Sequence, residues 1–232
     1  MPNKPFACFI TGTDTGVGKT LVTAALLCAA RNGGLSTIGL KPVAAGCEQT
    51  PGGLRNEDAL MLQQYTSLPL SYEQINPVAL AQAIAPHIAA ANEQRRVDAA
   101  RLEGLCRAAL MQRADLTLIE GAGGWRVPIS PRQYLSDLVR LLDIPVMLVV
   151  GIRLGCINHA LLSAEAICAD GARLLGWIAN EVDPQMPCID ENVQAIEARI
   201  DAPLVGRIGW LEGDDPVAAA AACLDINRLL PG

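Results

Sequence analysis

Short apolar runs alternate with longer stretches of helical character along this chain. The apolar runs predict buried strands over residues 6–10, 36–40, 116–119, 146–150, 174–179 and 204–206. The stretches between them predict helices over residues 21–31, 57–65, 98–112, 135–142, 158–169, 189–200 and 216–224. Strands and helices in alternation form a mainly parallel sheet that is covered on both faces. The pattern therefore predicts an α/β fold with three layers and a doubly wound sheet.

Two segments depart from this alternation. Residues 49–56 contain Pro51-Gly52-Gly53 and predict a loop, and residues 67–97 predict an irregular region with short helices. No internal repeat, low-complexity segment or domain linker is evident in the 232 residues. We therefore expect residues 1–232 to form a single domain, which is long enough to bury a large core.

The first predicted strand leads into a glycine-rich turn, Gly12-Thr13-Asp14-Thr15-Gly16-Val17-Gly18-Lys19-Thr20. Between a strand and a helix, such a turn lets consecutive backbone N–H groups close on a phosphate at the positive end of a helix dipole. Lys19 would pair with the β- and γ-phosphates, and the Thr20 hydroxyl would bind Mg²⁺. The strict motif G-x-x-x-x-G-K-[ST] is missed by one residue, because position 13 is Thr. The Val-Gly-Lys-Thr core in this context still predicts a nucleoside triphosphate site on a P-loop NTPase fold.

Charged residues follow two further predicted strands, at the edge where α/β sheets bind their ligands. Glu120 comes directly after residues 116–119, where a second metal-coordinating acid of a P-loop enzyme would lie, and the glycines after it suit a backbone close to a ligand. Lys41 comes directly after residues 36–40, where a cation could hold a carbamate or a γ-phosphate, or could lie on the surface. Asp58, at a helix start, could bind metal or only favour the helix dipole.

Two later segments are also candidates. Residues 155–158, Gly-Cys-Ile-Asn, open a predicted helix whose N–H groups could hold a carboxylate, although most helix starts bind only water. Asn180 follows the predicted strand 174–179 and could read the edge of adenine, or could simply form a turn. The residues themselves leave both assignments open.

Composition and charge narrow the range of partners. The net charge of −6 argues against nucleic acid, and no basic run offers a membrane anchor. The longest helical apolar stretch is too short to span a bilayer. The first strand begins close to the N-terminus without a signal peptide, so a cytoplasmic location is expected. Eight cysteines without a C-x-x-C pair and two isolated histidines predict neither a zinc site nor a serine–histidine triad.

Six segments of the chain together resemble the dethiobiotin synthetase family of biotin biosynthesis. They are residues 11–20 (TGTDTGVGKT), 41–44 (KPVA), 50–56 (TPGGLRN), 120–125 (EGAGGW), 154–160 (LGCINHA) and 176–180 (GWIAN). They run in the family's order over about residues 6–211, which is nearly the whole chain. The Gly-Cys-Ile-Asn-His-Ala string is far more specific to the family than the P-loop.

The resemblance implies an ATP-dependent cyclo-ligase that joins CO2 to 7,8-diaminononanoate, called the diamine below. One amine would form a carbamate, ATP would phosphorylate it to a carbamic-phosphoric mixed anhydride, and the second amine would close a five-membered urea ring. Mg²⁺ would accompany ATP, which is a co-substrate. The resemblance also implies a homodimer in which each active site is shared by two chains.

The resemblance further implies roles for individual residues. Lys41 would be the catalytic lysine at the carbamate and the γ-phosphate, and Thr20, Asp58 and Glu120 would hold Mg²⁺. The residues expected to bind the nucleotide are Gly16, Val17, Gly18, Lys19, Thr20, Leu21, Asp58, Glu120, Gly121, Ala122, Gly123, Asn180, Glu181, Gly209, Trp210 and Leu211. The residues expected to bind the diamine's carboxylate, from the partner subunit, are Gly155, Cys156, Ile157 and Asn158.

The chain departs from the family at three positions. Ala45 stands where many members have a serine near the substrate, and Gly16 stands where some have an acid. Gly209 replaces a proline that is often found in the adenine loop. None of these departures touches the phosphate, metal or lysine chemistry.

Two other classes of P-loop protein compete with this interpretation. A cobyrinate-type amidoligase also activates a carboxylate-like group with ATP, but such chains usually carry an added glutaminase domain. A partitioning-type switch ATPase would have a lysine at the place of Asp14 and often a membrane-binding C-terminal helix. Residues 218–224 contain no Lys or Arg, which does not suit an anionic membrane.

Overall fold

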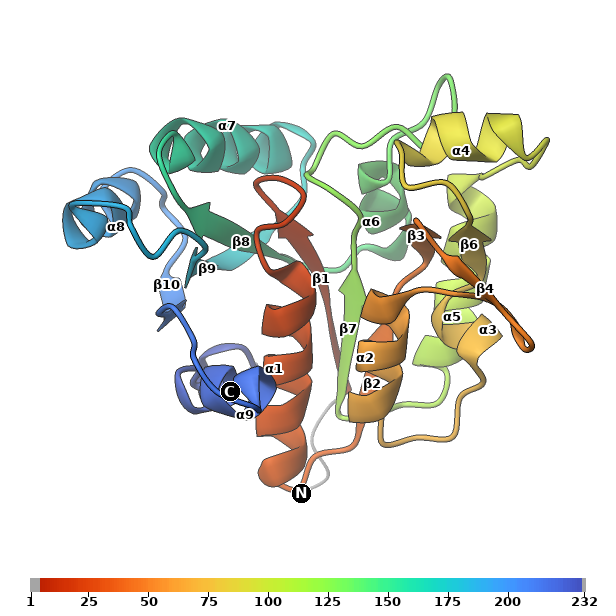
Figure 1. The fold of residues 1–232 in the computed structure, drawn as a ribbon, viewed down its shortest axis with the longest axis horizontal. Coiled ribbons are helices and arrows are strands. Elements are labelled where there is room, and N and C mark those ends of the chain that lie inside the picture. Colours follow the sequence, from red (N-terminus) through yellow and green to blue (C-terminus); the bar gives the residue numbers. More distant parts are fainter. Residues whose placement is uncertain (1–4, 231–232) are drawn as a thin grey trace.

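A computed structural model describes residues 5–230 and gathers their longer strands in one parallel sheet (Figure 1). Within these residues, six strands pair in the order β10-β9-β8-β1-β7-β2, and every pair is parallel. They are β1 (Phe6–Gly12), β2 (Thr37–Leu40), β7 (Leu116–Glu120), β8 (Val146–Ile152), β9 (Leu174–Glu181) and β10 (Leu204–Ile208). The strand order reverses around β1, so a crevice opens beyond its carboxyl end. The predicted doubly wound fold is confirmed.

Helices cover both faces of this sheet. One face carries α1 (Lys19–Asn32), α2 (Glu57–Tyr65) and α9 (Pro216–Ala222), and Figure 1 shows α2 and α9 on either side of α1. The opposite face carries α5 (Ala99–Leu110), α6 (Ser136–Leu142), α7 (Cys156–Ala169) and α8 (Ile189–Glu197). A short 3₁₀ helix, η1 (Ile226–Arg228), follows α9. The three predicted layers are thus present.

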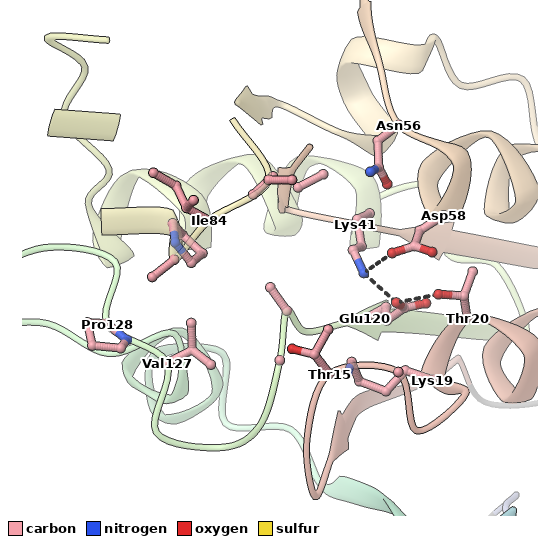
Figure 2. A pocket seen from close by; sticks show the side chains of 18 of the residues that line it. Thr15, Lys19, Thr20, Lys41, Asn56, Asp58, Ile84, Glu120, Val127 and Pro128 are labelled. Atoms are coloured by element: carbon pink, nitrogen blue, oxygen red, sulfur yellow. Dashed lines mark hydrogen bonds and ion pairs between the residues drawn. The ribbon is translucent and has the colours of Figure 1, made fainter. Parts of the chain in front are cut away.

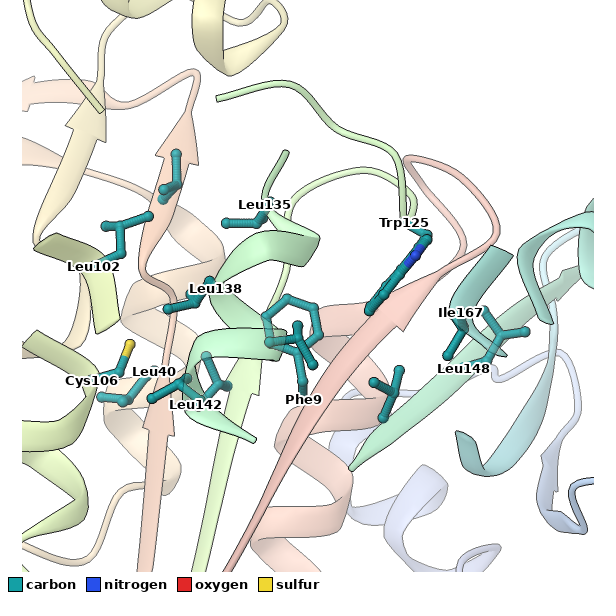
Figure 3. Packing of buried hydrophobic residues seen from close by; sticks show 14 of the residues in the cluster. Phe9, Leu40, Leu102, Cys106, Trp125, Leu135, Leu138, Leu142, Leu148 and Ile167 are labelled. Atoms are coloured by element: carbon teal, nitrogen blue, oxygen red, sulfur yellow. The ribbon is translucent and has the colours of Figure 1, made fainter. Parts of the chain in front are cut away.

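Alternate residues of the central strands enter two separate hydrophobic clusters, one on each face of the sheet. In β1, Cys8 and Ile10 pack against α1, whereas Phe9 faces the other cluster. The Phe9 ring meets the Trp125 ring edge-on, with centroids 6.5 Å apart, as Figure 3 shows among the buried leucines of that side. Because both faces are covered, the strands read as continuous apolar runs rather than as alternating patterns.

Four short strands form where the sequence predicts a loop or gives no strand signal. β3 (Val43–Ala45) pairs in parallel with β6 (Val78–Leu80), and β4 (Glu48–Thr50) pairs antiparallel with β5 (Gly53–Arg55). The loop predicted over residues 49–56 is therefore wrong for the most part. A two-residue Pro-Gly turn closes the β4–β5 hairpin, and Gly53 takes a left-handed φ of 98°. The polar residues of this hairpin carry no apolar alternation that would have revealed it.

The irregular region predicted over residues 67–97 contains two short helices, α3 (Tyr72–Ile75) and α4 (Pro86–Asn92), besides β6. Elsewhere the observed bounds differ from the predicted ones by a few residues at element ends, as is usual for pattern-based prediction. One difference affects the site. β9 extends to Glu181, so Asn180 lies inside the sheet, in register with Gly151 and Ile208, and not in a turn.

Candidate functional site

A cavity of about 800 Å³ opens beyond the carboxyl ends of β1, β2 and β7 (Figure 2). The P-loop and the start of α1 form one wall, and Lys41, Asp58 and Glu120 lie together at its deep end. The residues before α4 and after β7 form a largely apolar opposite wall, made of Ala83, Ile84, Ala85, Pro86, Val127 and Pro128. The cavity thus combines a charged end with an apolar side.

The P-loop is held in a conformation that only glycine adopts easily. Gly16 and Gly18 have φ values of 73° and 87°, in the left-handed region. A Cβ on Gly18 would lie 2.2 Å from the Asn180 amide nitrogen, so this position has no room for a side chain. Among the described residues, no side chain caps the start of α1 at Gly18. The first N–H groups of α1 therefore remain available to a phosphate.

Lys19 carries its charge in a buried and unfavourable place. Its ammonium group donates to the Asp14 carbonyl at 2.8 Å, across the P-loop. Burial, together with the nearby charge of Lys41, lowers the pKa of Lys19 from 10.5 to about 8, although Glu120, Asp58 and Asp14 act in the opposite direction. An anion bound in the P-loop would relieve this penalty. The site therefore fits the phosphate groups that the sequence predicts here.

Lys41 links the two acids of the site directly. Its Nζ donates to Glu120 Oε1 at 2.5 Å and to Asp58 Oδ2 at 2.8 Å, the dashed contacts of Figure 2, and to the Gly121 carbonyl at 3.2 Å. Burial opposes the charge on this side chain, but the two carboxylates outweigh it and raise the pKa of Lys41 above its usual value. Lys41 is therefore a buried ammonium group that stays protonated.

The predicted metal ligands also lie together. Thr20 Oγ1 donates to Glu120 Oε1 at 2.9 Å, and Lys41 holds the pKa of Asp58 below its usual value although burial acts the other way. Glu120 is fully buried, and within residues 5–230 nothing donates to its second oxygen, Oε2. Two carboxylates and a hydroxyl are oxygen ligands that suit Mg²⁺, which completes its shell with phosphate oxygens and water. This donor set, with its unsatisfied buried oxygen, fits the metal.

The residues predicted at adenine lie behind the P-loop, outside this cavity. Asn180 is buried, and its Nδ2 donates to the Val17 carbonyl at 3.0 Å, so it supports the loop directly. Glu181 Oε1 accepts from Arg207 Nε at 3.0 Å, and a Cβ on Gly209 would lie 3.9 Å from the other Glu181 oxygen. Half of the Trp210 surface is exposed. These residues share one end of the sheet, at β9 and β10.

The segment predicted to bind the diamine's carboxylate lies away from the cavity of its own chain. None of residues 155–158 is among the described residues that line the cavity. Gly155 has a φ of 92°, and no side chain of the described residues caps the start of α7. A Cβ on Gly155 would meet nothing within 4 Å. At the start of α7, Gly155 and Asn158 are therefore exposed, whereas Cys156 is buried.

Several residues of the site region carry no sequence signal. Arg153 Nη2 binds the Asp14 carboxylate at 2.6 Å and so ties the P-loop to the end of β8. Ile84 and Val127 line the apolar wall, although nothing in the local pattern places them opposite the P-loop. Their positions depend on how loops far apart in the chain meet.

The comparisons with known proteins agree with this architecture. A family model described as an AAA domain matches residues 7–217. The MinC:MinD cell division protein complex of Aquifex aeolicus aligns with a TM-score of 0.58 at 18% identity, covering 94% of this chain and 85% of that chain. A ParA family ATPase from Chlorobium tepidum TLS aligns with a TM-score of 0.56 at 14% identity, covering 97% and 92%. A parallel sheet of this order with a glycine-rich loop after β1 defines a P-loop NTPase.

Curated relatives give a narrower assignment. The ATP-dependent dethiobiotin synthetase BioD of Cellvibrio japonicus (strain Ueda107) is 58% identical over 233 residues, covering 99% of both chains. That of Pseudomonas aeruginosa (strain UCBPP-PA14) is 58% identical over 223 residues, covering 96% of this chain and 97% of the relative. The chain therefore belongs to the family of ATP-dependent dethiobiotin synthetases. This membership separates it from the cobyrinate-type amidoligases and the partitioning-type ATPases. Within residues 5–230, no helix is both long and apolar enough to cross a membrane.

Proposed function

We propose that this chain uses ATP to convert 7,8-diaminononanoate and CO2 into dethiobiotin, with Mg²⁺ as the metal. Near full-length relatives at 58% identity carry the name ATP-dependent dethiobiotin synthetase. The observation that carries the assignment is the buried ammonium group of Lys41, held between two carboxylates beside the P-loop. A permanent positive charge in this place suits a reaction in which negative charge develops during phosphoryl transfer.

The reaction has three steps. An amine nitrogen of the diamine attacks the carbon of CO2 and loses a proton, which gives a carbamate. A carbamate oxygen then attacks the γ-phosphorus of ATP, ADP leaves, and a carbamic-phosphoric anhydride forms. The second amine attacks the carbonyl carbon, phosphate leaves, the nitrogen loses a proton, and the five-membered urea ring is closed.

Individual residues would act on these steps as follows. The N–H groups at the start of α1 and the Lys19 ammonium would bind the phosphates, and Lys41 would donate to the carbamate and to the transferring phosphoryl group. Thr20, Asp58 and Glu120 would hold Mg²⁺, which when bound offsets the charge of the triphosphate. The remaining nucleotide contacts are assigned to Gly16, Val17, Gly18, Leu21, Gly121, Ala122, Gly123, Asn180, Glu181, Gly209, Trp210 and Leu211.

The apolar wall suits the rest of the diamine. Ile84 and Val127 line the cavity opposite the charged end, where the methylene chain could bury its surface. The chain's carboxylate would then extend beyond the cavity of one subunit. We assign it to the start of α7, at Gly155–Asn158, of a second copy in a closed two-fold homodimer.

A coupled ADP-release assay tests the proposed activity. ADP release should require both the diamine and bicarbonate, and mass spectrometry should detect dethiobiotin. Lys41→Ala should leave only a small residual rate of product formation, and Lys41→Arg should recover little, because a planar guanidinium group cannot replace a point charge held by three acceptors. Equally fast ATP hydrolysis without the diamine would instead favour a switch ATPase.

A further inference from the structure

The backbone of Lys41 is held on both sides by the short segment Tyr72–Asn76. The Lys41 N–H donates to the Ile75 carbonyl at 2.8 Å. The Asn76 side chain donates from Nδ2 to the Lys41 carbonyl at 2.6 Å, and more weakly to the Val78 carbonyl at 3.4 Å. Both polar groups of the Lys41 main chain therefore depend on a segment more than thirty residues away.

The same segment also holds the start of α2, the helix that carries Asp58. The Tyr72 hydroxyl accepts from the Asn56 N–H at 2.8 Å and donates to Asn76 Oδ1 at 3.0 Å. Asn56 is the N-cap of α2, and its side chain accepts from the Ala59 N–H at 3.3 Å. A continuous chain of hydrogen bonds thus runs from the cap of α2 through Tyr72 and Asn76 to the Lys41 carbonyl.

This chain of hydrogen bonds is buried and well supported. Tyr72 is 6% exposed and Asn76 is 3% exposed. The Arg55 guanidinium lies 4.1 Å from the centre of the Tyr72 ring and pairs with Glu73 at 3.1 Å. Ser71 caps α3 with a reciprocal capping box. In such a place a lost partner leaves a buried polar group unsatisfied, so the connected groups favour a single geometry.

We propose that Tyr72 and Asn76 are positioning residues for the ligation reaction. They fix the Lys41 backbone relative to the start of α2, so that the Lys41 ammonium and the Asp58 carboxylate keep their 2.8 Å contact. Neither Tyr72 nor Asn76 is among the described residues that line the cavity, so they act through Lys41 and α2 rather than on the substrate. The proposal rests on the catalytic role proposed for Lys41.

The test compares Tyr72→Phe, Asn76→Ala and the double variant with Tyr65→Phe. Tyr65 offers the same chemical change at the end of α2, but packs against the other hydrophobic cluster. We expect kcat to fall by about 10- to 100-fold in the single variants, as a small misplacement of a catalytic group can cause. The KM for ATP should change by less than about threefold, since the P-loop is untouched. The double variant should be little worse than the poorer single, because the two residues act as one unit.

The rate measured in a Lys41→Ala background separates positioning from a merely structural role. In a Lys41→Ala background, Tyr72→Phe should have little further effect on the residual rate, because Tyr72 acts through the Lys41 side chain and that side chain is already absent. A rate loss of the same size in that background would overturn the proposal. So would a kcat within twofold of wild type in folded Tyr72→Phe and Asn76→Ala proteins. If Asn76→Ala does not fold, Asn76→Ser provides the second variant at this position.

Amide hydrogen exchange of the ligand-free protein gives a readout that does not depend on catalysis. Tyr72→Phe removes the acceptor of the Asn56 N–H, so we expect faster exchange at Asn56 and at Lys41, with no change in Tyr65→Phe. Unchanged protection at both amides would overturn the proposed coupling. A wild-type protein that makes no dethiobiotin would contradict the proposed function, yet the exchange data would still decide whether the segment holds both backbones.

Discussion

Two buried lysines lie in the same cavity, and their replacement should change the stability of the ligand-free protein in opposite directions. Lys19 is 6% exposed, and its pKa falls from 10.5 to about 8, mainly because burial disfavours its charge. At 1.36 kcal/mol per pKa unit, this drop corresponds to about 3 kcal/mol. Lys19→Met keeps a flexible chain of similar shape without the charge. We therefore expect it to raise the free energy of unfolding by about 3 kcal/mol at pH 7.

This gain should depend on pH. The unfolded chain holds the Lys19 proton up to about pH 10.5, whereas the folded protein releases it near pH 8. Between these values the unfolded state binds more protons, so the stability of the wild type rises with pH. The advantage of Lys19→Met should therefore be complete below pH 8 and fade as the pH approaches 10.5.

Lys41→Met is the matched control, with the opposite sign expected. Removal of the Lys41 ammonium group would leave the fully buried Glu120 carboxylate without the cation that neutralises it, whose Nζ lies 2.5 Å from Glu120 Oε1. Breaking a buried pair in this way costs about 3–5 kcal/mol. The same substitution in the same cavity should thus stabilise the protein at one lysine and destabilise it at the other.

Urea and thermal unfolding of the ligand-free proteins at pH 7 and pH 9.5 would measure both effects. For a chain of this length, 3 kcal/mol corresponds to a rise in Tm of about 6–12 °C. A Lys19→Met protein that is no more stable than wild type at pH 7 would refute the reasoning. So would a gain that is equally large at pH 9.5, because the wild type has by then lost most of the penalty.

Three other predictions concern the nucleotide, the metal and the assembly. Above about pH 8 the KM for ATP should rise, because Lys19 of the ligand-free enzyme loses its proton. Calorimetry in buffers of different ionisation enthalpy should then detect proton uptake on ATP binding. Binding that does not depend on pH would contradict this prediction. Glu120→Gln should raise the Mg²⁺ concentration needed for ADP release by about 100-fold, read from a metal titration and from Mn²⁺ paramagnetic resonance, whereas an unchanged titration would exclude Glu120 as a ligand. A 1:1 mixture of Lys41→Ala and Gly155→Trp proteins should regain about a quarter of wild-type activity, because half of the dimers are mixed and each has one intact site. Gly155→Asn controls for the left-handed backbone, and an active monomer by light scattering would rule out the shared site.

The sequence by itself determined the elements that depend on local information. The apolar runs and helical spacing specify the strands and helices of the main sheet, because burial on both faces demands such patterns. The P-loop is equally local, since its nine residues form one strand-to-helix turn. The sequence also predicts that Lys41 and Glu120 lie near it, because the carboxyl ends of parallel strands share one edge of the sheet.

Only the tertiary structure decided how those residues contact one another. Thr20 and Glu120 are one hundred positions apart in the chain, and Lys41 and Glu120 are seventy-nine apart. Their contacts depend on strand order, and no local pattern specifies that order. Likewise, Asn180 looks like a turn residue in the sequence, but its place in β9 directs its amide to the P-loop.

The polar hairpin and the Tyr72–Asn76 segment were equally hidden. The hairpin carries no apolar alternation, and α3, although Tyr72 and Ile75 are buried, is too short to show a period. The polar contacts of Tyr72 and Asn76 with distant residues leave no pattern in the sequence. Hydrophobic burial leaves a periodic signal in the sequence, whereas a directional polar contact leaves only single residues whose partners are unknown until the chain has folded. The sequence therefore specified the fold and the chemical groups of the site, and the tertiary structure set the distances between them.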